Sequence, residues 1–159
     1  VKACPLHDIG KLGIPEAILL KKDKLTVDEF TLVKTHTTIG YDSIRSAIEP
    51  SIFDRLMESA MNSESLEFFR EALNIAKYHH ERWDGTGYPK HLKKINIPLG
   101  ARIIALASYY DDVIFSSPNF KHKDRPEVSR AIFSGSGILF DPDVVSAFLN
   151  VVFHNLKIG

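Results

Sequence analysis

Apolar residues recur at three- and four-residue intervals along much of the chain, which is the spacing of one face of an α-helix. The longest such stripe begins after Thr26 and Glu29, which form a T-x-x-E capping box, and it ends at Glu49-Pro50. The stripe predicts one continuous helix between these boundaries. Its core-facing positions are Leu32, Val33, His36, Ile39, Gly40, Ile44, Ala47 and Ile48.

Caps, prolines and shorter stripes predict the other helices. Pro15 suits the first turn of a short helix at Glu16–Leu20. Asp141-Pro142 is typical of the start of a last helix. The valines that follow would also suit a strand, but the Asp-Pro start and the length favour a helix. No alternating strand pattern with hairpin turns occurs elsewhere, so the sequence predicts an all-α bundle. The remaining helices are expected at 54–61, from the caps at 62–65 to His80, from Pro98 through Tyr110, and at 126–133.

The composition is that of a globular protein without an excess of either charge. The 159 residues suit one domain, and 44% of them are hydrophobic. Since 20 Lys and Arg balance 20 Asp and Glu, nothing indicates a nucleic-acid polymer or a membrane surface as partner. No apolar run approaches the length of a membrane span. The single cysteine, Cys4, excludes a disulfide framework and is interpreted as a small buried hydrophobe.

Histidine is the residue type that points to chemistry. The chain has seven, among them His7 beside Asp8 and the adjacent pair His79-His80. His36 lies in the core-facing stripe, and the pair continues the apolar spacing of the helix before it. A single histidine on such a face is usually a satisfied core residue, whereas several with an aspartate also suit a transition metal. The spacing alone leaves both interpretations open.

The segments around these histidines resemble the HD-GYP family, a branch of the HD metal-dependent phosphohydrolases. The stretch from Leu6 to Pro15, LHDIGKLGIP, resembles the core of the family, and His79 to Pro89, HHERWDGTGYP, resembles the signature that names it. This resemblance covers essentially the whole chain. Further matches are Lys34-Thr35-His36 with Ile39-Gly40, the segment Ile97 to Ile103, and Gly137 to Pro142.

The resemblance implies an HD-domain-like helical bundle with a C-terminal HD-GYP helical extension, and we expect residues 1–159 to be one such domain without its N-terminal helices. It implies a phosphodiesterase that hydrolyses cyclic di-GMP at a centre of two or three metal ions, often iron or manganese. For this chain we expect one or two divalent transition-metal ions, iron or manganese. Family members usually form the output end of bacterial signalling proteins. We therefore expect a receiver or sensor domain N-terminal to this one and a cytoplasmic location, and a homodimer stays open.

The family's metal ligands map onto five residues of this sequence. The resemblance implies that Asp8 bridges two ions and that His7 binds the first. It implies that His36 and His79 bind the second ion, and that His80 binds the second or a third. Such a centre acidifies a shared hydroxide and clamps the phosphate oxygens as charge develops on them.

Substrate contacts are implied in the same way. Lys11 would meet the scissile phosphate as a point charge and act with Asp8 in catalysis. The Gly85–Pro89 loop would shape the mouth of the site, with Gly87, Tyr88 and Pro89 as substrate-binding residues. These assignments rest on the resemblance alone.

The sequence departs from the family at one metal-ligating aspartate, which is replaced by Ser108. A neutral hydroxyl is a poor ligand for a divalent cation, and Asp111 or Asp112 would have to compensate for it. An upstream ligand and a later arginine of the family also have no counterpart here. Two functions therefore stay open: a cyclic di-GMP phosphodiesterase of full or weak activity, and a catalytically degenerate domain that senses the nucleotide or docks proteins.

Overall fold

The structure, a computed structural model, describes residues 2–57, 64–115 and 125–154. Among these residues there are helices and no β-strand, only an isolated bridge between Ser136 and Phe140, so the predicted all-α class is confirmed. The α-helices are α1 (Glu16–Leu19), α2 (Val27–Lys34), α3 (His36–Ser46), α4 (Pro50–Met57), α5 (Glu64–Tyr78), α6 (Leu99–Phe115), α7 (Arg125–Ser134) and α8 (Pro142–His154). Three short 3₁₀-helices are η1 (Cys4–Leu6), η2 (Ile9–Gly13) and η3 (Lys94–Asn96).

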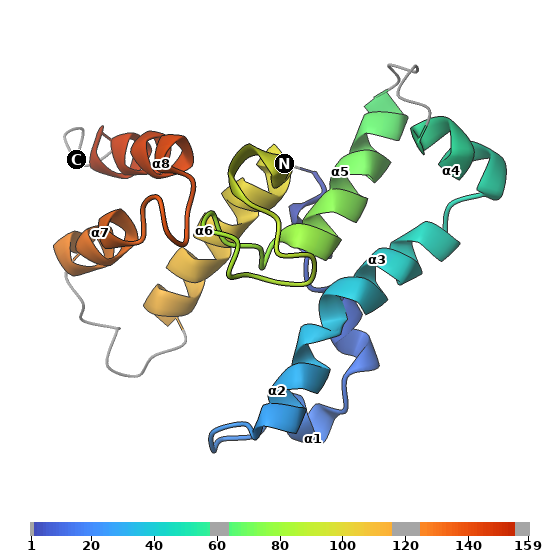
Figure 1. The fold of residues 1–159 in the computed structure, drawn as a ribbon, viewed down its shortest axis with the longest axis horizontal. Coiled ribbons are helices and arrows are strands. Elements are labelled where there is room, and N and C mark those ends of the chain that lie inside the picture. Colours follow the sequence, from blue (N-terminus) through green and yellow to red (C-terminus); the bar gives the residue numbers. More distant parts are fainter. Residues whose placement is uncertain (1, 58–63, 116–124, 155–159) are drawn as a thin grey trace. The chain divides into compact units, whose positions relative to one another are not determined.

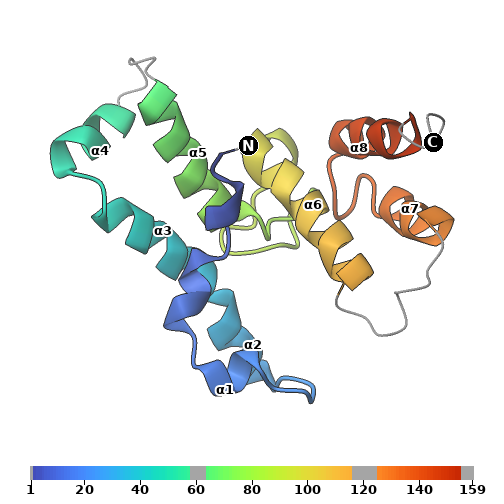
Figure 2. The same ribbon diagram turned by 180° about the vertical axis from the view of Figure 1, so that it is seen from behind.

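The chain folds as two compact units, residues 1–80 and 81–159. In unit 1, α3 packs against α5 and against η2, as Figure 1 shows for the two α-helices. Seen from behind, the N-terminal segment that contains η1 runs beside α5 (Figure 2). The buried centre between α3, α4 and α5 consists of Ile48, Leu66 and Leu73, with Tyr41, Ile44, Phe53 and Phe69 packed around it.

Unit 2 has its own core, in which α6, α7 and α8 meet. Its buried residues are Leu106, Val128, Ile132, Phe140 and Val145. The signature loop is tied to this unit by the Trp83 and Asp84 amides, which donate to the carbonyl oxygens of Leu139 and Ile138 at 3.2 and 3.0 Å. An ion pair between Arg102 of α6 and the buried Asp141 joins the start of α6 to the start of α8.

The long helix predicted from Thr26 to Glu49 is two helices, because the chain breaks at Thr35. Hydroxyl and imidazole side chains near the break bond to carbonyl oxygens of the last turns of α2, and such bonds compete with a continuous helical ladder. Thr35 Oγ1 donates to the Leu32 carbonyl at 2.6 Å, and His36 Nδ1 lies 2.6 Å from the Val33 carbonyl. The predicted capping box is confirmed, since Glu29 N donates to Thr26 Oγ1 and Thr26 N to Glu29 Oε2.

Several other boundaries differ from the sequence prediction. α4 begins at Pro50 rather than Asp54, and Met61 and the caps at 62–63 lie outside the described residues. The last helix is confirmed, so its strand alternative is wrong. Cys4 is half-buried rather than buried, because it lies in η1 at the edge of unit 1. The 3₁₀-helices were not predicted, since so short a run leaves no periodic pattern.

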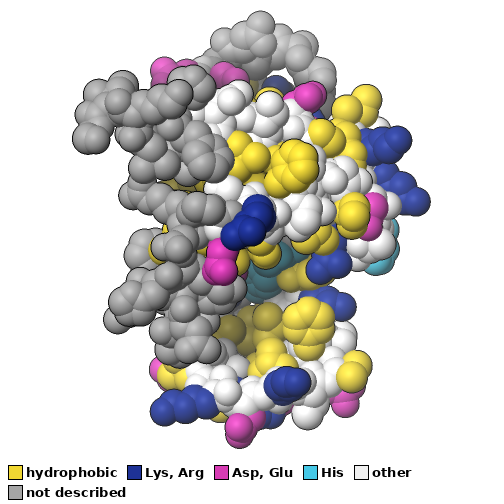
Figure 3. Space-filling model, turned by 90° about the vertical axis from the view of Figure 1, so that its left-hand side faces the viewer, with side chains coloured by type: hydrophobic (Ala, Val, Ile, Leu, Met, Phe, Trp, Pro, Cys, Tyr) yellow, Lys and Arg dark blue, Asp and Glu magenta, His cyan; other side chains and the backbone are white. Residues whose placement is uncertain are grey.

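The surface agrees with the balanced composition. On the face drawn in Figure 3, lysine, arginine and acidic side chains are interspersed with hydrophobic ones, without a field of one sign. Within the described residues, no helix combines the length and the apolar character that crossing a membrane requires.

Candidate metal centre

Four potential ligands come together from three segments of unit 1. Asp8 is the residue before η2, His36 begins α3, and His79 and His80 follow directly after α5. The approach of η2 to α3 depends on Gly10, where a Cβ atom would lie 1.9 Å from the carbonyl oxygen of His36. Only a residue without a side chain allows this contact, which brings the Asp8 carboxylate to the first turn of α3.

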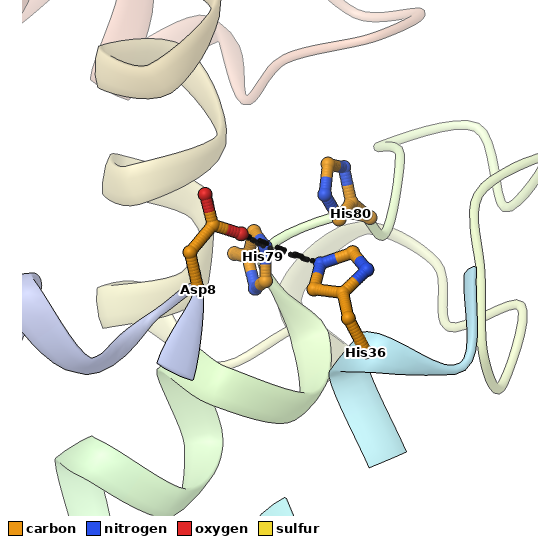
Figure 4. A group of neighbouring side chains, drawn as sticks. All are labelled: Asp8, His36, His79 and His80. Atoms are coloured by element: carbon orange, nitrogen blue, oxygen red, sulfur yellow. Dashed lines mark hydrogen bonds and ion pairs between the residues drawn. The ribbon is translucent and has the colours of Figure 1, made fainter. Parts of the chain in front are cut away.

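The ligand atoms are spaced as an ion would require. His36 Nε2 and His79 Nε2 are 3.4 Å apart, and Asp8 Oδ1 lies 3.4 Å from the first and 3.6 Å from the second. Two ligands about 2.1 Å from a tetrahedral ion are themselves about 3.4 Å apart. With one atom of His80 added, all four ligand atoms lie within 4.8 Å of one another (Figure 4).

Main-chain carbonyls determine which histidine nitrogens face this point. Nδ1 of His36 lies 2.6 Å from the Val33 carbonyl, and Nδ1 of His79 lies 2.8 Å from the Ile75 carbonyl. Since a carbonyl oxygen can only accept, each Nδ1 carries the proton and each neutral ring turns an Nε2 lone pair inward. Two Nε2 atoms and a carboxylate oxygen thus converge, and with both rings neutral this donor set suits a cation between them.

Burial and charge favour the ligand form of these groups. Burial lowers the pKa of His36, and burial together with the neighbouring imidazoles lowers the pKa of His80 to about 3. Burial would raise the pKa of Asp8, but its hydrogen bonds, that with His7 foremost, outweigh burial and hold the pKa well below its usual range. The same bond raises the pKa of His7. At neutral pH the cluster therefore offers neutral imidazole from His36 and His80 and an anionic Asp8.

The cluster is closed at His36 and His79, half-buried at His80 and open at its carboxylate. His36 is 1% exposed and His79 is 2% exposed, whereas 29% of the Asp8 side chain is accessible. A ligand or water can thus reach the centre from the Asp8 side. Asp8 Oδ1 is buried and accepts no hydrogen bond from the described residues, which leaves it available to an ion.

The sequence profile of the HD domain family matches residues 2–144, a range that contains all four clustered side chains. The chain belongs to the HD domain family. This confirms the family predicted from the His-Asp and HHERWDGTGYP motifs. An HD domain implies a divalent metal, and the described cluster has the donor types and spacing to hold one.

Curated relatives of this HD domain include nucleotide phosphodiesterases. It is 44% identical over 149 residues to the cyclic di-GMP phosphodiesterase of Thermotoga maritima, covering 94% of this chain and 36% of the relative. It is 44% identical over 153 residues to a cyclic di-GMP phosphodiesterase of Vibrio cholerae, covering 94% and 28%. A 3'3'-cGAMP-specific phosphodiesterase of V. cholerae is 30% identical, covering 92% and 25%. The chain thus spans about a third or less of the length of these relatives.

Two further predicted site residues lie at the outer oxygen of Asp8 in this HD domain. Lys11 Nζ is 2.6 Å from Asp8 Oδ2, and His7 Nε2 is 3.3 Å from the same oxygen. His7 Nδ1 lies 2.8 Å from the Cys4 carbonyl, which orients its ring. Both residues therefore adjoin the cluster without belonging to the group of four.

The loop residues Gly87, Tyr88 and Pro89 and the replaced position Ser108 belong to unit 2. Their predicted roles at the metal centre stay predictions. The Tyr88-Pro89 peptide is cis, and Ser108 is half-buried on α6. Asp111 and Asp112, the two residues proposed to compensate for Ser108, are exposed.

Sequence reasoning missed Glu81, the buried carboxylate that holds the signature loop. Glu81 is 3% exposed, and its two oxygens accept the amides of Lys90 at 2.7 Å and Leu92 at 3.1 Å. It follows the histidine pair directly in the chain, so it fixes the loop whose start is the metal-ligating segment. The only sequence signal was its place inside the HHERWDGTGYP stretch, which does not distinguish a buried glutamate from a solvated one.

Proposed function

We propose that this chain is a signalling domain of the cyclic di-GMP phosphodiesterase type, which hydrolyses a phosphodiester bond at a divalent-metal centre. The observation that carries the proposal is the convergence of two oriented imidazole lone pairs and the Asp8 carboxylate, open to solvent on one side. Two relatives at 44% identity, both named cyclic di-GMP phosphodiesterases, support the substrate class.

In this proposal Asp8, His36, His79 and His80 hold the ion. Imidazole nitrogen with carboxylate oxygen suits iron or manganese. When bound, the ion supplies Lewis acidity toward a phosphate oxygen and lowers the pKa of a coordinated water. The protein's part is to keep His36 and His80 unprotonated and to shield His36 and His79 from solvent.

Lys11 is proposed to meet the phosphate while it holds Asp8. Its ammonium has three N–H donors, so one can bond Asp8 Oδ2 while another reaches a phosphate oxygen. The loop at Gly87, Tyr88 and Pro89 follows the ligand His80 closely in the chain, and we assign it to nucleotide binding. A receiver or sensor domain N-terminal to this one and a homodimer are proposed from the resemblance only.

The direct test is hydrolysis of cyclic di-GMP by purified protein supplied with Mn²⁺ or Fe²⁺. We expect turnover with metal, none after chelation, and none in His79→Ala. A parallel assay with 3'3'-cGAMP would decide which cyclic dinucleotide is preferred, since relatives specific for each are similar to this chain. Metal-loaded protein that binds the nucleotide without cleaving it would contradict the proposal.

Binding without cleavage would favour the alternative function, a catalytically degenerate domain that senses the nucleotide. The observation that favours this alternative is Ser108, which stands where the family has a metal-ligating aspartate. The variant Ser108→Asp restores the carboxylate that the family has at this position. If its absence limits catalysis, Ser108→Asp should raise turnover well above that of the wild type. Wild-type turnover on the order of 1 s⁻¹ or more would show that Ser108 is not a crippling change.

A further inference from the structure

Lysines gather directly after the signature loop, in a stretch without acidic residues. Lys90, Lys93 and Lys94 follow one another closely, and the sequence contains neither Asp nor Glu between Asp84 and Asp111. The zero net charge of the whole chain conceals this local excess of positive charge. The segment belongs entirely to unit 2 and leads into α6 (Figure 1).

The three lysines are exposed, and their ammonium groups are not paired. Within residues 2–57, 64–115 and 125–154, no ion pair involves any of them. Lys2, Lys11 and Lys21, by contrast, each pair with a carboxylate. The one arginine of the acid-free stretch, Arg102, pairs with Asp141. The positive charge that this stretch offers to an external anion is therefore that of its three lysines.

The backbone that carries these lysines is held in place by the loop before it. The amide of Lys90 donates to the buried Glu81 carboxylate at 2.7 Å, and the amide of Lys94 donates to the Trp83 carbonyl at 3.0 Å. The aliphatic chain of Lys93 lies across Gly85, where a Cβ atom would be 2.4 Å from its Cγ and Cε. Binding an anion would therefore order the ends of the side chains and not the loop itself, which lowers the entropic cost.

An exposed apolar side chain follows the lysines directly. Ile95 lies in η3 and is 79% exposed, so it projects from the surface. Leu99 and Ile103 of α6 are 55% and 46% exposed. They are four residues apart and therefore lie on one face of the helix. Positive charge and exposed apolar surface thus adjoin in one short segment of unit 2.

We propose that residues 90–95 dock this chain on the surface of an anionic phospholipid bilayer. The lysines contact the headgroups, and Ile95 enters the boundary with the acyl chains. A bilayer presents negative charge next to an apolar interior, which complements unpaired lysines next to a projecting isoleucine. A single-stranded nucleic acid fits less well, because its binding uses aromatic stacking and the sequence has no aromatic residue between Tyr88 and Tyr109. The inference depends neither on the metal centre nor on the proposed activity.

The experiment measures binding of the purified chain to sedimentable vesicles. One set of vesicles contains equal parts of phosphatidylserine and phosphatidylcholine, and the other contains phosphatidylcholine alone. We expect binding to the first set only, and weaker binding as salt is added, because salt screens the attraction. The variant Lys90→Gln/Lys93→Gln/Lys94→Gln should bind the first set roughly 100-fold more weakly, a factor of about five for each lysine.

Two further variants separate the apolar contact and the net charge from the lysine segment. Ile95→Ser should weaken binding roughly tenfold at every salt concentration, because it removes the apolar contact and leaves the charge unchanged. The matched control is Lys21→Gln/Lys22→Gln/Lys24→Gln, which changes the net charge equally in a loop of unit 1 where Lys21 pairs with Glu29 at 2.7 Å. It should leave binding nearly unchanged. Circular dichroism confirms that each variant is folded.

Equal binding to both sets of vesicles, binding to neither, or equal losses in the two triple variants would overturn the inference. Ile95→Ser protein that binds as tightly as the wild type would overturn the insertion of the isoleucine. Soluble polyglutamate tests for an acidic protein as the partner instead. A chain that binds polyglutamate and not the anionic vesicles would overturn the assignment of a lipid surface.

Discussion

At the scale of single residues, the carbonyl oxygens of Val33 and Ile75 matter as much as the ligands themselves. Each accepts the Nδ1 proton of one imidazole and so presents Nε2 to the common point. A histidine held in this way loses little rotational freedom on binding and keeps the tautomer that an ion needs. The cluster is therefore prepared for metal before metal arrives.

His79→Ala should remove most of the bound metal. The side chain is 2% exposed and its Nε2 lies at the centre of the cluster, so no water-exposed group can replace it. We expect affinity to fall by roughly 100-fold or more, as measured by competition with a chelator. The matched control is His91→Asn, which changes a histidine outside the cluster and keeps a residue that tolerates its positive φ. Equal metal loss in both variants would contradict the site.

The metal-free protein should lose stability as the pH falls, partly through His80. Its pKa is lowered from 6.5 in the unfolded chain to about 3 in the fold by burial and neighbouring imidazoles. Between these values the unfolded state binds more protons, so the stability present above pH 6.5 declines toward acid. In chelator-treated protein, His80→Gln should lose about 1–2 kcal/mol less than the wild type on going from neutral pH to about pH 5.

His7 acts in the opposite direction, because its raised pKa adds stability at low pH that is lost as the pH rises through the folded value. The comparison of the wild type with His80→Gln cancels this contribution, since both proteins retain His7. Denaturant unfolding at the two pH values measures the difference. Identical losses in the two proteins would refute the lowered pKa of His80.

At the scale of elements, the contact between η2 and α3 positions the carboxylate. Gly10 lies at the crossing, where a Cβ atom would be 1.9 Å from the His36 carbonyl oxygen and 2.5 Å from the Gly40 nitrogen. Both are backbone atoms and cannot move aside without shifting a helix. A change that disrupts the contact between η2 and α3 should therefore also disrupt the metal site.

Gly10→Ala should destabilise the protein by about 3 kcal/mol and also weaken metal binding, because the clash moves Asp8 away from His36. Thermal unfolding and the chelator competition measure the two effects. Gly13→Ala is the matched variant in the same 3₁₀-helix, where the added methyl meets only the Ile39 side chain, 3.0 Å away. We expect a smaller loss there, and a Gly10→Ala protein with normal stability and affinity would contradict the crossing.

At the scale of the whole molecule, the two units have separate hydrophobic cores and separate clusters of interacting polar side chains. The metal cluster belongs entirely to residues 1–80, whereas the pair of Arg102 and Asp141 belongs to residues 81–159. Asp141 also accepts the amide of Asp143 at 2.9 Å and so caps the start of α8. A change at this pair should act first on the second unit.

Asp141→Asn should destabilise unit 2 by about 3 kcal/mol, because it leaves the partly buried Arg102 without its charge partner while the cap acceptor is kept. Hydrogen exchange should show lost protection in α6 and α8 and nearly unchanged protection in α3. Equal losses in both units would mean that they unfold as one cooperative body.

Interactions between residues close in the chain allowed much of this protein's secondary structure to be predicted from its sequence. The capping box at Thr26, the proline starts of α1 and α8, and the all-α class depend on interactions within a few positions of the chain. The motifs around Asp8 and His79 likewise identified the family and the ligand types, because metal chemistry restricts which side chains can serve. These features therefore follow from the sequence alone.

Long-range packing determined the features that the sequence did not predict. His36 and His79 are 43 positions apart, and only the contacts of α3 with α5 and η2 bring their Nε2 atoms to 3.4 Å. The break at Thr35 arises where side chains compete for the carbonyls of α2, a balance too fine for helical spacing to reveal. Packing likewise decides which oxygen of Asp8 faces Lys11 and which faces the histidines. Sequence motifs specify which groups take part, whereas long-range packing specifies where each lone pair points.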